Sequence, residues 1–193
     1  MLFFFYGTLM DDELRGALAG AKDATLRITP GTLLNHRRCR ARFGNYPVVI
    51  PQPGGRLSGL FVEGVDAHLA LWIAHYEGPG YVPARVSAVD HAGQRLRPWA
   101  FMPLTRQDAS REPWDLQAWQ RHDKPAVRRL MQNWLLHVDG GRPLALDAPW
   151  LSRRRLWAAV RLGNDQPRPN PHLGLTGCSP IHADDEGLGA AAE

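Results

Sequence analysis

The chain begins with an apolar run that stops abruptly at a tyrosine, a glycine and a threonine. Residues 2–5 read LFFF, and Tyr6, Gly7 and Thr8 follow directly. Consecutive residues with strong strand preference and no polar alternation are typical of a strand buried on both faces. The sequence therefore predicts a central strand over Leu2–Phe5 that ends in a tight turn, where exposed backbone N–H groups suit a carboxylate or a developing oxyanion.

Short strands and two helices are expected to alternate between residues 11 and 101. Asp11–Ala19 has acidic residues in its first turn, and Asp66–Tyr76 repeats its apolar residues at helical spacing, so both indicate helices. Arg27–Arg42 is strand-like, with an expected break at Pro30-Gly31. Further extended segments are predicted over Tyr46–Pro51, Leu57–Val62, Val82–Val89 and Arg95–Phe101, with turns at Pro53–Gly55 and His91–Gly93.

The character of the sequence changes near Asp108. Residues 1–108 are rich in predicted strands, whereas residues 109–162 have a helical pattern that includes a predicted helix over Ala148–Leu162. From Gly163 the chain is rich in Pro, Gly, Asn and Asp and has little periodicity. We therefore expect a core over residues 1–108, a helical extension packed on it over 109–162, and a disordered tail over 163–193.

Composition limits the class of protein. The 193 residues are 44% hydrophobic and carry a net charge of +4, which allows one sizeable core and suits a substrate with carboxylates. Cys39 and Cys178 lie far apart without a Cys/His cluster, which disfavours a disulfide framework or a zinc site and fits a reducing cytoplasm. The short apolar start lacks a preceding basic residue, and no run reaches the length of a membrane span, so we expect neither a signal peptide nor a membrane segment.

Arginine is concentrated in two places, at residues 37–42 and at Arg153–Arg155. Arg38, Arg40 and Arg42 would share one face of a strand because side chains alternate. A solvated strand face is the favoured interpretation, and a patch that attracts anionic substrates or RNA is the alternative.

One carboxylate stands at an unfavourable place. The stretch HYEGPGY, His75–Tyr81, puts Glu77 at the end of an amphipathic helix, beside aromatic residues and a Gly-Pro-Gly loop. The C-terminal end of a helix favours cations, so a negative charge there is locally unfavourable and points to a site. A carboxyl half-buried among aromatic rings would have a raised pKa and could act first as a base and then as an acid near neutral pH.

Three segments together resemble a known family. FFYGTL near the N-terminus, YPVVIPQPGGRLSGLFVEG in the middle and LALWIAHYEGPGYVPARVSAV after it are similar, in order and spacing, to the gamma-glutamylcyclotransferase-like family. The resemblance covers about residues 1–102. It implies an α+β fold, a small mixed β-barrel with surrounding helices, to which this chain adds its C-terminal helical extension.

The resemblance also implies an activity and its residues. A gamma-glutamyl compound would cyclise when its α-amine attacks its own γ-carbonyl, which releases 5-oxoproline and an amine or amino acid. Glu77 falls on the family's catalytic glutamate, and Tyr81 follows it at the pocket wall. Residues that would bind the glutamyl end are Tyr6, Gly7, Thr8 and Leu9. The expected partner is a small molecule, with no metal, organic cofactor, nucleic acid or membrane.

Other functions stay open on the sequence. A related cyclotransferase could act on gamma-glutamylamines or on a biosynthetic gamma-glutamyl protecting group. A catalytically silent member could bind a metabolite or a protein, although the presence of Glu77 argues against it. An RNA-associated protein would use the two arginine runs, and steep salt dependence of RNA binding would reveal it.

Overall fold

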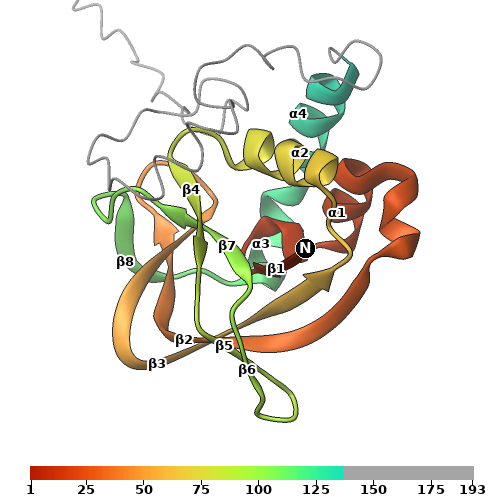
Figure 1. Cartoon of the computed structure of the whole chain (residues 1–193). Coiled ribbons are helices and arrows are strands. Elements are labelled where there is room, and N and C mark those ends of the chain that lie inside the picture. The colour runs from red at the N-terminus through yellow and green to blue at the C-terminus, as the bar shows by residue number, and fades with distance from the viewer. Residues whose placement is uncertain (137–193) are drawn as a thin grey trace, which may run out of the picture.

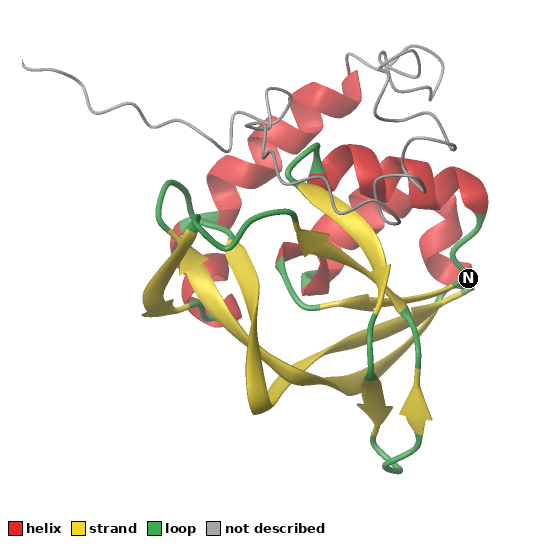
Figure 2. Ribbon diagram, turned by 60° about the vertical axis from the view of Figure 1, so that its left-hand side comes forward, coloured by secondary structure: helices red, strands yellow, loops and turns green. Residues whose placement is uncertain are grey.

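A curled mixed sheet with helices along one side forms the part of the protein that the computed structural model describes, residues 1–136 (Figures 1 and 2). The strands are β1 Leu2–Phe5, β2 Arg27–Ala41, β3 Pro47–Glu63, β4 Tyr81–Arg85, β5 Ala88–Asp90, β6 Arg95–Leu96, β7 Trp99–Pro103 and β8 Ala109–Pro113. The helices are α1 Asp12–Ala19, α2 Ala67–Glu77, α3 Leu116–His122 and α4 Lys124–Leu136, with short 3-10 turns at Thr8–Met10 and Gly20–Thr25.

Within the described residues the strand order is β4-β7-β1-β3-β2-β5-β6, and β8 pairs with β2. β1 pairs in parallel with β7 and antiparallel with β3, so the first strand of the chain lies inside the sheet. The sheet curls into half a barrel with helices around it, which is the fold that the resemblance implied.

Both faces of β1 are buried, as the apolar run predicted. Phe3 and Phe5 join an apolar cluster with side chains of the four α-helices, whereas Phe4 and Tyr6 join a second cluster inside the curl of the sheet. Because strand side chains alternate, a strand between two apolar clusters needs large apolar residues at every position. The LFFF run satisfies that requirement.

The expected break at Pro30-Gly31 is wrong, because β2 runs without interruption from Arg27 to Ala41. Gly31 pairs with Gly59 of β3, and a Cβ at Gly31 would lie 2.2 Å from the ring of Phe61. Glycine is therefore needed here for the close approach of an aromatic ring and does not end the strand.

The predicted turn at Pro53–Gly55 is also part of a longer strand, since β3 extends from Pro47 to Glu63. The pairing between β2 and β3 shifts register between Leu34 and His36, where extra residues of β3 bulge out. Asn35 and Gly54 both have positive φ, and the Asn35 side chain accepts a hydrogen bond from Gly54 N. A β-bulge of this kind bends a long strand pair.

The two predicted helices are confirmed with their caps. The Asp11 side chain accepts a hydrogen bond from Leu14 N at the start of α1, and Asp66 accepts one from Leu69 N at the start of α2. The predicted apolar face of α2 is buried against the sheet, and Gly78 ends the helix with a φ of 73°. Glu77 is thereby fixed as the last residue of α2.

The strands after α2 are shorter than predicted, and one more strand, β8, follows residue 108. The segment Val82–Val89 divides into β4 and β5, and Arg95–Phe101 divides into β6 and β7, around a turn near His91–Gly93. β8 pairs with β2, so the sheet extends beyond residue 108. The proposed division into a core and an extension stays a prediction. The predicted helix at Ala148–Leu162, the tail after Gly163, Arg153–Arg155 and Cys178 lie outside the described residues.

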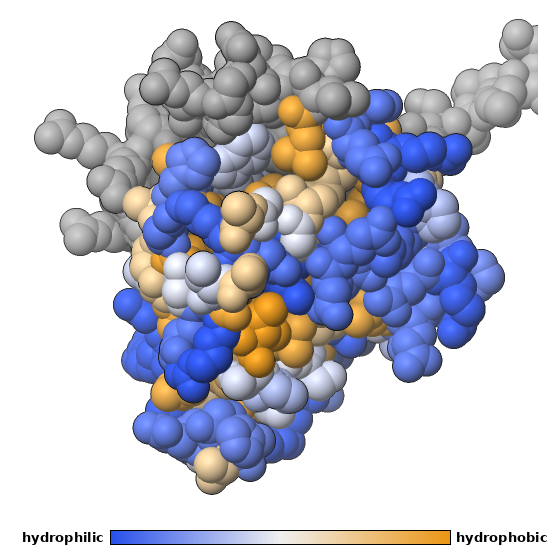
Figure 3. Space-filling view, turned by 90° about the vertical axis from the view of Figure 1, so that its right-hand side faces the viewer, coloured by the Kyte–Doolittle hydropathy of each residue, from blue (hydrophilic) through white to orange (hydrophobic). Residues whose placement is uncertain are grey.

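The side of the molecule at the right of Figure 1, which carries α1, has a mostly hydrophilic surface with a small apolar area near its centre (Figure 3). Asp12 and Glu13 are exposed on α1, whereas Leu14 and Leu18 of the same helix are buried. Among the described helices, none combines the length and the apolar character that a membrane span requires.

Candidate active site

A cavity of about 320 Å³ opens where the end of β1, the end of α2 and the segment that joins β2 to β3 meet. This size suits a small metabolite. All of the site residues predicted from the sequence line it, namely Tyr6, Gly7, Thr8, Leu9, Glu77 and Tyr81. The fold thus brings the N-terminal turn and the carboxylate at the end of α2 together, although some 70 positions separate them in the sequence.

The turn after β1 is held by its own side chains. The Tyr6 hydroxyl donates a hydrogen bond to the Phe101 carbonyl of β7, and Thr8 Oγ1 shares a hydrogen bond of 2.7 Å with the Tyr76 hydroxyl of α2. Gly7 precedes the 3-10 turn Thr8–Met10, and the first N–H groups of a helical turn lack a partner within that turn. These donors are available to a ligand.

Gly7 allows the turn to pass close to β3. A Cβ at this position would lie 3.0 Å from Cγ of Pro47, which is the second residue of the YPVVIP stretch. The φ of Gly7 is −123°, so its role is space for the neighbouring chain and not a left-handed backbone.

Glu77 is the carboxyl in the cavity wall whose pKa is shifted by burial. Burial raises the pKa of its carboxyl to about 8, and among the described residues no hydrogen bond or ion pair compensates. Its place at the C-terminal end of α2 adds an unfavourable interaction with the helix dipole. A carboxyl with such a pKa changes its protonation state near neutral pH, which is a property of a general base or acid.

Two tyrosines near Glu77, the buried Tyr6 and the partly buried Tyr81, have hydroxyls that are already hydrogen-bonded. Burial raises the pKa of Tyr6 and Tyr81, and the nearby Glu77 raises both further. The Tyr81 hydroxyl donates to the Pro47 carbonyl at 3.2 Å. These side chains therefore shape the cavity wall and hold the turn, whereas the pKa of Glu77 lies close to neutral pH.

Other parts of the wall were not expected from the sequence. Phe43 and Tyr46 come from the connection between β2 and β3, and Pro47 is the first residue of β3. Asp108 precedes β8, and Trp119 and Val127 come from α3 and α4. The YPVVIP motif could have pointed to Tyr46 and Pro47. Trp119 and Val127 are apolar residues at helical spacing, which is also the pattern of ordinary core residues, so the sequence carries no signal that separates the two roles.

The turn is also held from outside the cavity by Arg38. Its guanidinium donates to the Tyr6 carbonyl at 2.6 Å and lies over the Trp114 ring, 4.9 Å from the ring centre. The interpretation of the arginine run as a solvated face therefore fails at Arg38, which is half-buried, while Arg37, Arg40 and Arg42 are exposed. A cation over an aromatic face is favourable and restricts the orientation of both groups.

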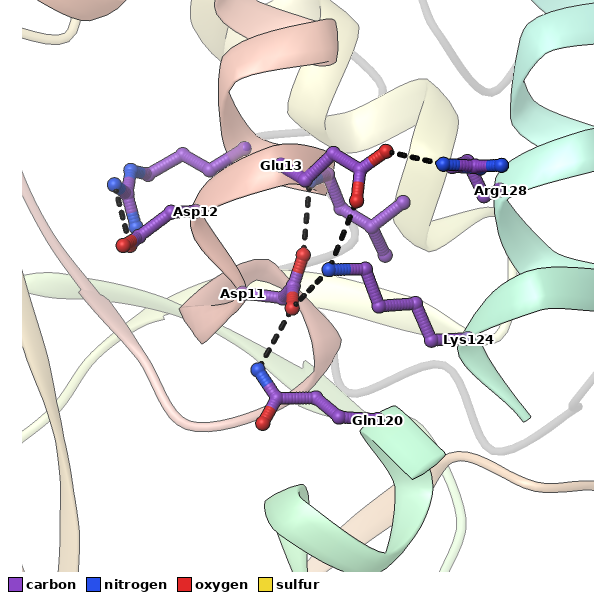
Figure 4. Close-up of polar contacts among 8 residues, drawn as sticks. Asp11, Asp12, Glu13, Gln120, Lys124 and Arg128 are labelled. Atoms are coloured by element: carbon purple, nitrogen blue, oxygen red, sulfur yellow. Dashed lines mark hydrogen bonds and ion pairs between the residues drawn. The ribbon is translucent and has the colours of Figure 1, made fainter. Parts of the chain in front are cut away.

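Asp11, which follows the turn, connects it to α3 and α4 through hydrogen bonds (Figure 4). It is 2% exposed and accepts hydrogen bonds from Gln120 Nε2 at 2.7 Å and from Lys124 Nζ at 2.9 Å. Burial alone would raise the pKa of Asp11, but the hydrogen bonds from Lys124, Gln120 and Leu14 outweigh it, so the pKa lies below its ordinary value. Lys124 also pairs with Glu13 at 3.0 Å.

Metal ligands do not gather in residues 1–136: no three His, Cys, Asp or Glu side chains lie together there.

The fold and the cavity define a small α+β protein in which the turn after the first strand faces a carboxylate at a helix end. The model of the family described as gamma-glutamyl cyclotransferase, AIG2-like, matches residues 3–121. The chain belongs to this family. No curated protein matches the sequence significantly.

Solved structures with low sequence identity share the fold. The solution structure of At5g39720.1 from Arabidopsis thaliana is 21% identical with a TM-score of 0.50, and the match covers 70% of this chain and 89% of that one. The solution structure of At3g28950.1 from the same plant is 19% identical with a TM-score of 0.51, over 70% of this chain and 82% of that one. At this identity the likeness concerns the fold alone.

Proposed function

We propose that the protein is a cyclotransferase that cleaves a small gamma-glutamyl compound and releases 5-oxoproline. The observation that supports this most directly is the position of Glu77, a carboxyl with a pKa of about 8 in a cavity that it shares with the N-terminal turn. Family membership supplies the reaction class, and the cavity supplies a group with the protonation behaviour that the reaction needs.

The reaction takes place within one substrate molecule. The α-nitrogen of the glutamyl group forms a bond to its own γ-carbon, and the bond from that carbon to the leaving nitrogen breaks. The attacking ammonium gives up two protons and becomes the ring N–H, while the leaving nitrogen gains two and departs as an ammonium. Glu77 takes the proton that frees the α-amine and returns a proton to the leaving nitrogen.

Positioning is the second contribution of the site. A flexible glutamyl chain must fold so that its amine reaches its own γ-carbon, and fixing such a geometry can lower a barrier by several kcal/mol. The N–H groups of Gly7, Thr8 and Leu9, at the start of the turn that lines the cavity, would hold oxygen atoms of the glutamyl group. Tyr81 would close the wall beside Glu77, where its hydroxyl is fixed on the Pro47 carbonyl.

Detection of 5-oxoproline tests the proposal. The full chain is incubated with glutathione, with gamma-glutamyl amino acids and with gamma-glutamylamines, and 5-oxoproline is measured by mass spectrometry. We expect its release from at least one compound and a large loss of release in the Glu77→Gln variant. Absence of 5-oxoproline from every compound, with a folded protein, would overturn the proposal and favour a family member that binds without catalysis.

A further inference from the structure

The cavity wall combines aromatic rings with two carboxylates and contains no basic side chain. Of the described residues that line it, Glu77 and Asp108 carry a negative charge, and none is a lysine, an arginine or a histidine. The chain as a whole has a net charge of +4, so the acidic lining is a local property of this cavity. The charges of the wall therefore disfavour a ligand that brings many carboxylates.

Asp108 lies between β7 and β8, is partly exposed, and has a carboxylate without a partner among the described residues. Its backbone carbonyl accepts a hydrogen bond from Arg42 N at 2.8 Å. The Arg42 side chain donates to the neighbouring Ala109 carbonyl at 3.3 Å and forms no ion pair with Asp108. The backbone of Asp108 is thus fixed, while its carboxylate can accept a cation from a ligand.

Asp108 acts on two tyrosines of the same wall. Burial raises the pKa of Tyr46, and the charge of Asp108 raises it further. Burial is also the main cause of the raised pKa of Tyr81, and Glu77 and Asp108 both add to it. The Tyr81 hydroxyl, fixed at 3.2 Å from the Pro47 carbonyl, therefore lies near both carboxylates. The cavity has two places that favour a positive charge, one at each carboxylate.

A gamma-glutamyl group can occupy only one of these places, because it carries a single ammonium. Under the proposed mechanism this ammonium lies at Glu77, and the glutamyl oxygens lie at the N-terminal turn. The charge of Asp108 is then left for the group that departs. A leaving amino acid would bring a carboxylate into a wall with two negative and no positive side chains, whereas a leaving amine with a second ammonium would complement it.

We propose that Asp108 selects a leaving group with a second cation, so that the substrate is the gamma-glutamyl derivative of a diamine or a longer polyamine. This inference rests on the proposed cyclotransferase function and names the substrate class of the same site. The Asp108 carboxylate pairs with the distal ammonium of the leaving amine. The rings of Phe43 and Tyr46, which also line the cavity, supply aromatic surface to its carbon chain and its charge.

Three compounds that differ at one end test this selection. They are the gamma-glutamyl amides of diaminobutane, butylamine and gamma-aminobutyric acid, whose leaving groups end in an ammonium, a methyl group and a carboxylate. Release of 5-oxoproline gives kcat/KM for each. In the parent we expect the diaminobutane compound to exceed the butylamine compound about tenfold, the effect of about one charge-assisted contact. The gamma-aminobutyric acid compound should be the poorest.

Asp108→Asn should remove the preference. The value of kcat/KM should fall about tenfold for the diaminobutane compound and far less for the butylamine compound, which has no cation at its end. The backbone carbonyl that Arg42 N binds is kept, so the melting temperature should stay within a few degrees of the parent. Asp108→Lys should reverse the order and favour the gamma-aminobutyric acid compound over the diaminobutane compound.

Glu112→Gln is the matched control for charge. Glu112 lies on β8, four residues after Asp108, pairs with Arg40 at 3.6 Å and does not line the cavity. Its substitution removes one negative charge, as Asp108→Asn does. A preference that came from long-range attraction of cations would weaken in both variants. We expect Glu112→Gln to keep the preference of the parent.

The outcomes separate the two proposals. A parent that converts the butylamine compound or a gamma-glutamyl amino acid as well as the diaminobutane compound would overturn the inference and leave the cyclotransferase function standing. Equal losses on all three compounds in Asp108→Asn would also overturn it, since Asp108 would then serve the shared glutamyl group. If neither these compounds nor glutathione yield 5-oxoproline, the proposed function fails and this inference fails with it.

Discussion

The carboxylate of Asp11 and the ammonium of Lys124 meet at 2.9 Å across 113 positions of the sequence. Asp11 follows the turn that lines the cavity, and Lys124 begins α4, so this contact joins the candidate active site to the C-terminal end of the described chain. We expect Lys124→Met to lower the free energy of unfolding by about 1–3 kcal/mol at pH 7, because the buried carboxylate loses its cation.

The contribution of the Asp11–Lys124 pair to the free energy of unfolding should depend on pH. The folded pKa of Asp11 lies below its ordinary value of 3.8, so the pair stabilises the fold above that pH and the contribution is lost as the pH falls. Urea unfolding at pH 7 and at pH 3 should therefore show a difference between parent and variant that shrinks at low pH. Arg128→Met is the control, because the Arg128–Glu13 pair is exposed and should contribute much less than the pair at the buried Asp11. Equal losses for both variants would refute the special role of Lys124.

Glu77→Gln should abolish most of the turnover while the cavity keeps its shape. The side chains are nearly isosteric, but the amide cannot take a proton, and loss of general acid–base catalysis costs on the order of 10²–10⁴ in rate. Ligand affinity should change much less than kcat. Glu63→Gln, at the end of β3 where Glu63 pairs with Arg27, should turn over as the parent does. Turnover of Glu77→Gln within a few-fold of the parent would exclude Glu77 as the base.

The same variant should be more stable than the parent at high pH. The folded pKa of Glu77 is about 8 and its ordinary value is 4.5, so between these values the unfolded chain is ionised while the folded protein holds a proton. Stability therefore falls as the pH rises from about 4.5 to about 8 and changes little beyond it. Melting temperatures of parent and Glu77→Gln should coincide near pH 4 and separate progressively up to pH 8. Parallel curves across this range would show that Glu77 has an ordinary pKa.

Gly7→Ala should weaken substrate binding. The added Cβ would meet the Pro47 ring at 3.0 Å, so the turn or the ring must move at the cavity wall. Overpacking of this kind costs about 1–3 kcal/mol, and we expect KM to rise about tenfold or more. In the control Gly16→Ala, the Cβ meets Asp23 at an ordinary 3.5 Å, Gly16 does not line the cavity, and KM should not change. An unchanged KM in Gly7→Ala would reduce Gly7 to a turn residue.

Local patterns predicted the central strand with the turn after it, the two helices, and Glu77 as an unusual carboxylate at a helix end. The resemblance supplied the other proposed site residues, which line the same cavity. The features predicted from local patterns depend on neighbours in the sequence. The LFFF run suits a strand with two apolar faces, the Asp66 side chain caps the start of α2, and the Gly78 N–H donates to Ala74 O at its end. The position of Glu77 followed from the end of its helix. The resemblance to a family then supplied the association between Glu77 and the distant turn at Gly7.

Features that depend on contacts between distant residues were missed. In the sequence, Pro30-Gly31 looks like the end of a strand. In the structure, the ring of Phe61 lies where a Cβ of residue 31 would be, so glycine is needed within the strand. Arg38 belongs to a run of similar arginines, and only Trp114 and the Tyr6 carbonyl distinguish it. Trp119 has the same spacing as a core residue, and its place in the cavity wall is visible only in three dimensions.

The position of β1 inside the sheet has a consequence for how the chain folds. β1 is synthesised before both of its neighbours in the sheet, since β3 begins at residue 47 and β7 at residue 99. Pairings over such sequence separations form slowly, because the loop between them must close first. We therefore expect the N-terminal turn to gain amide-exchange protection late during refolding, after the β2–β3 ribbon. The part of the candidate active site that is synthesised first is then completed last.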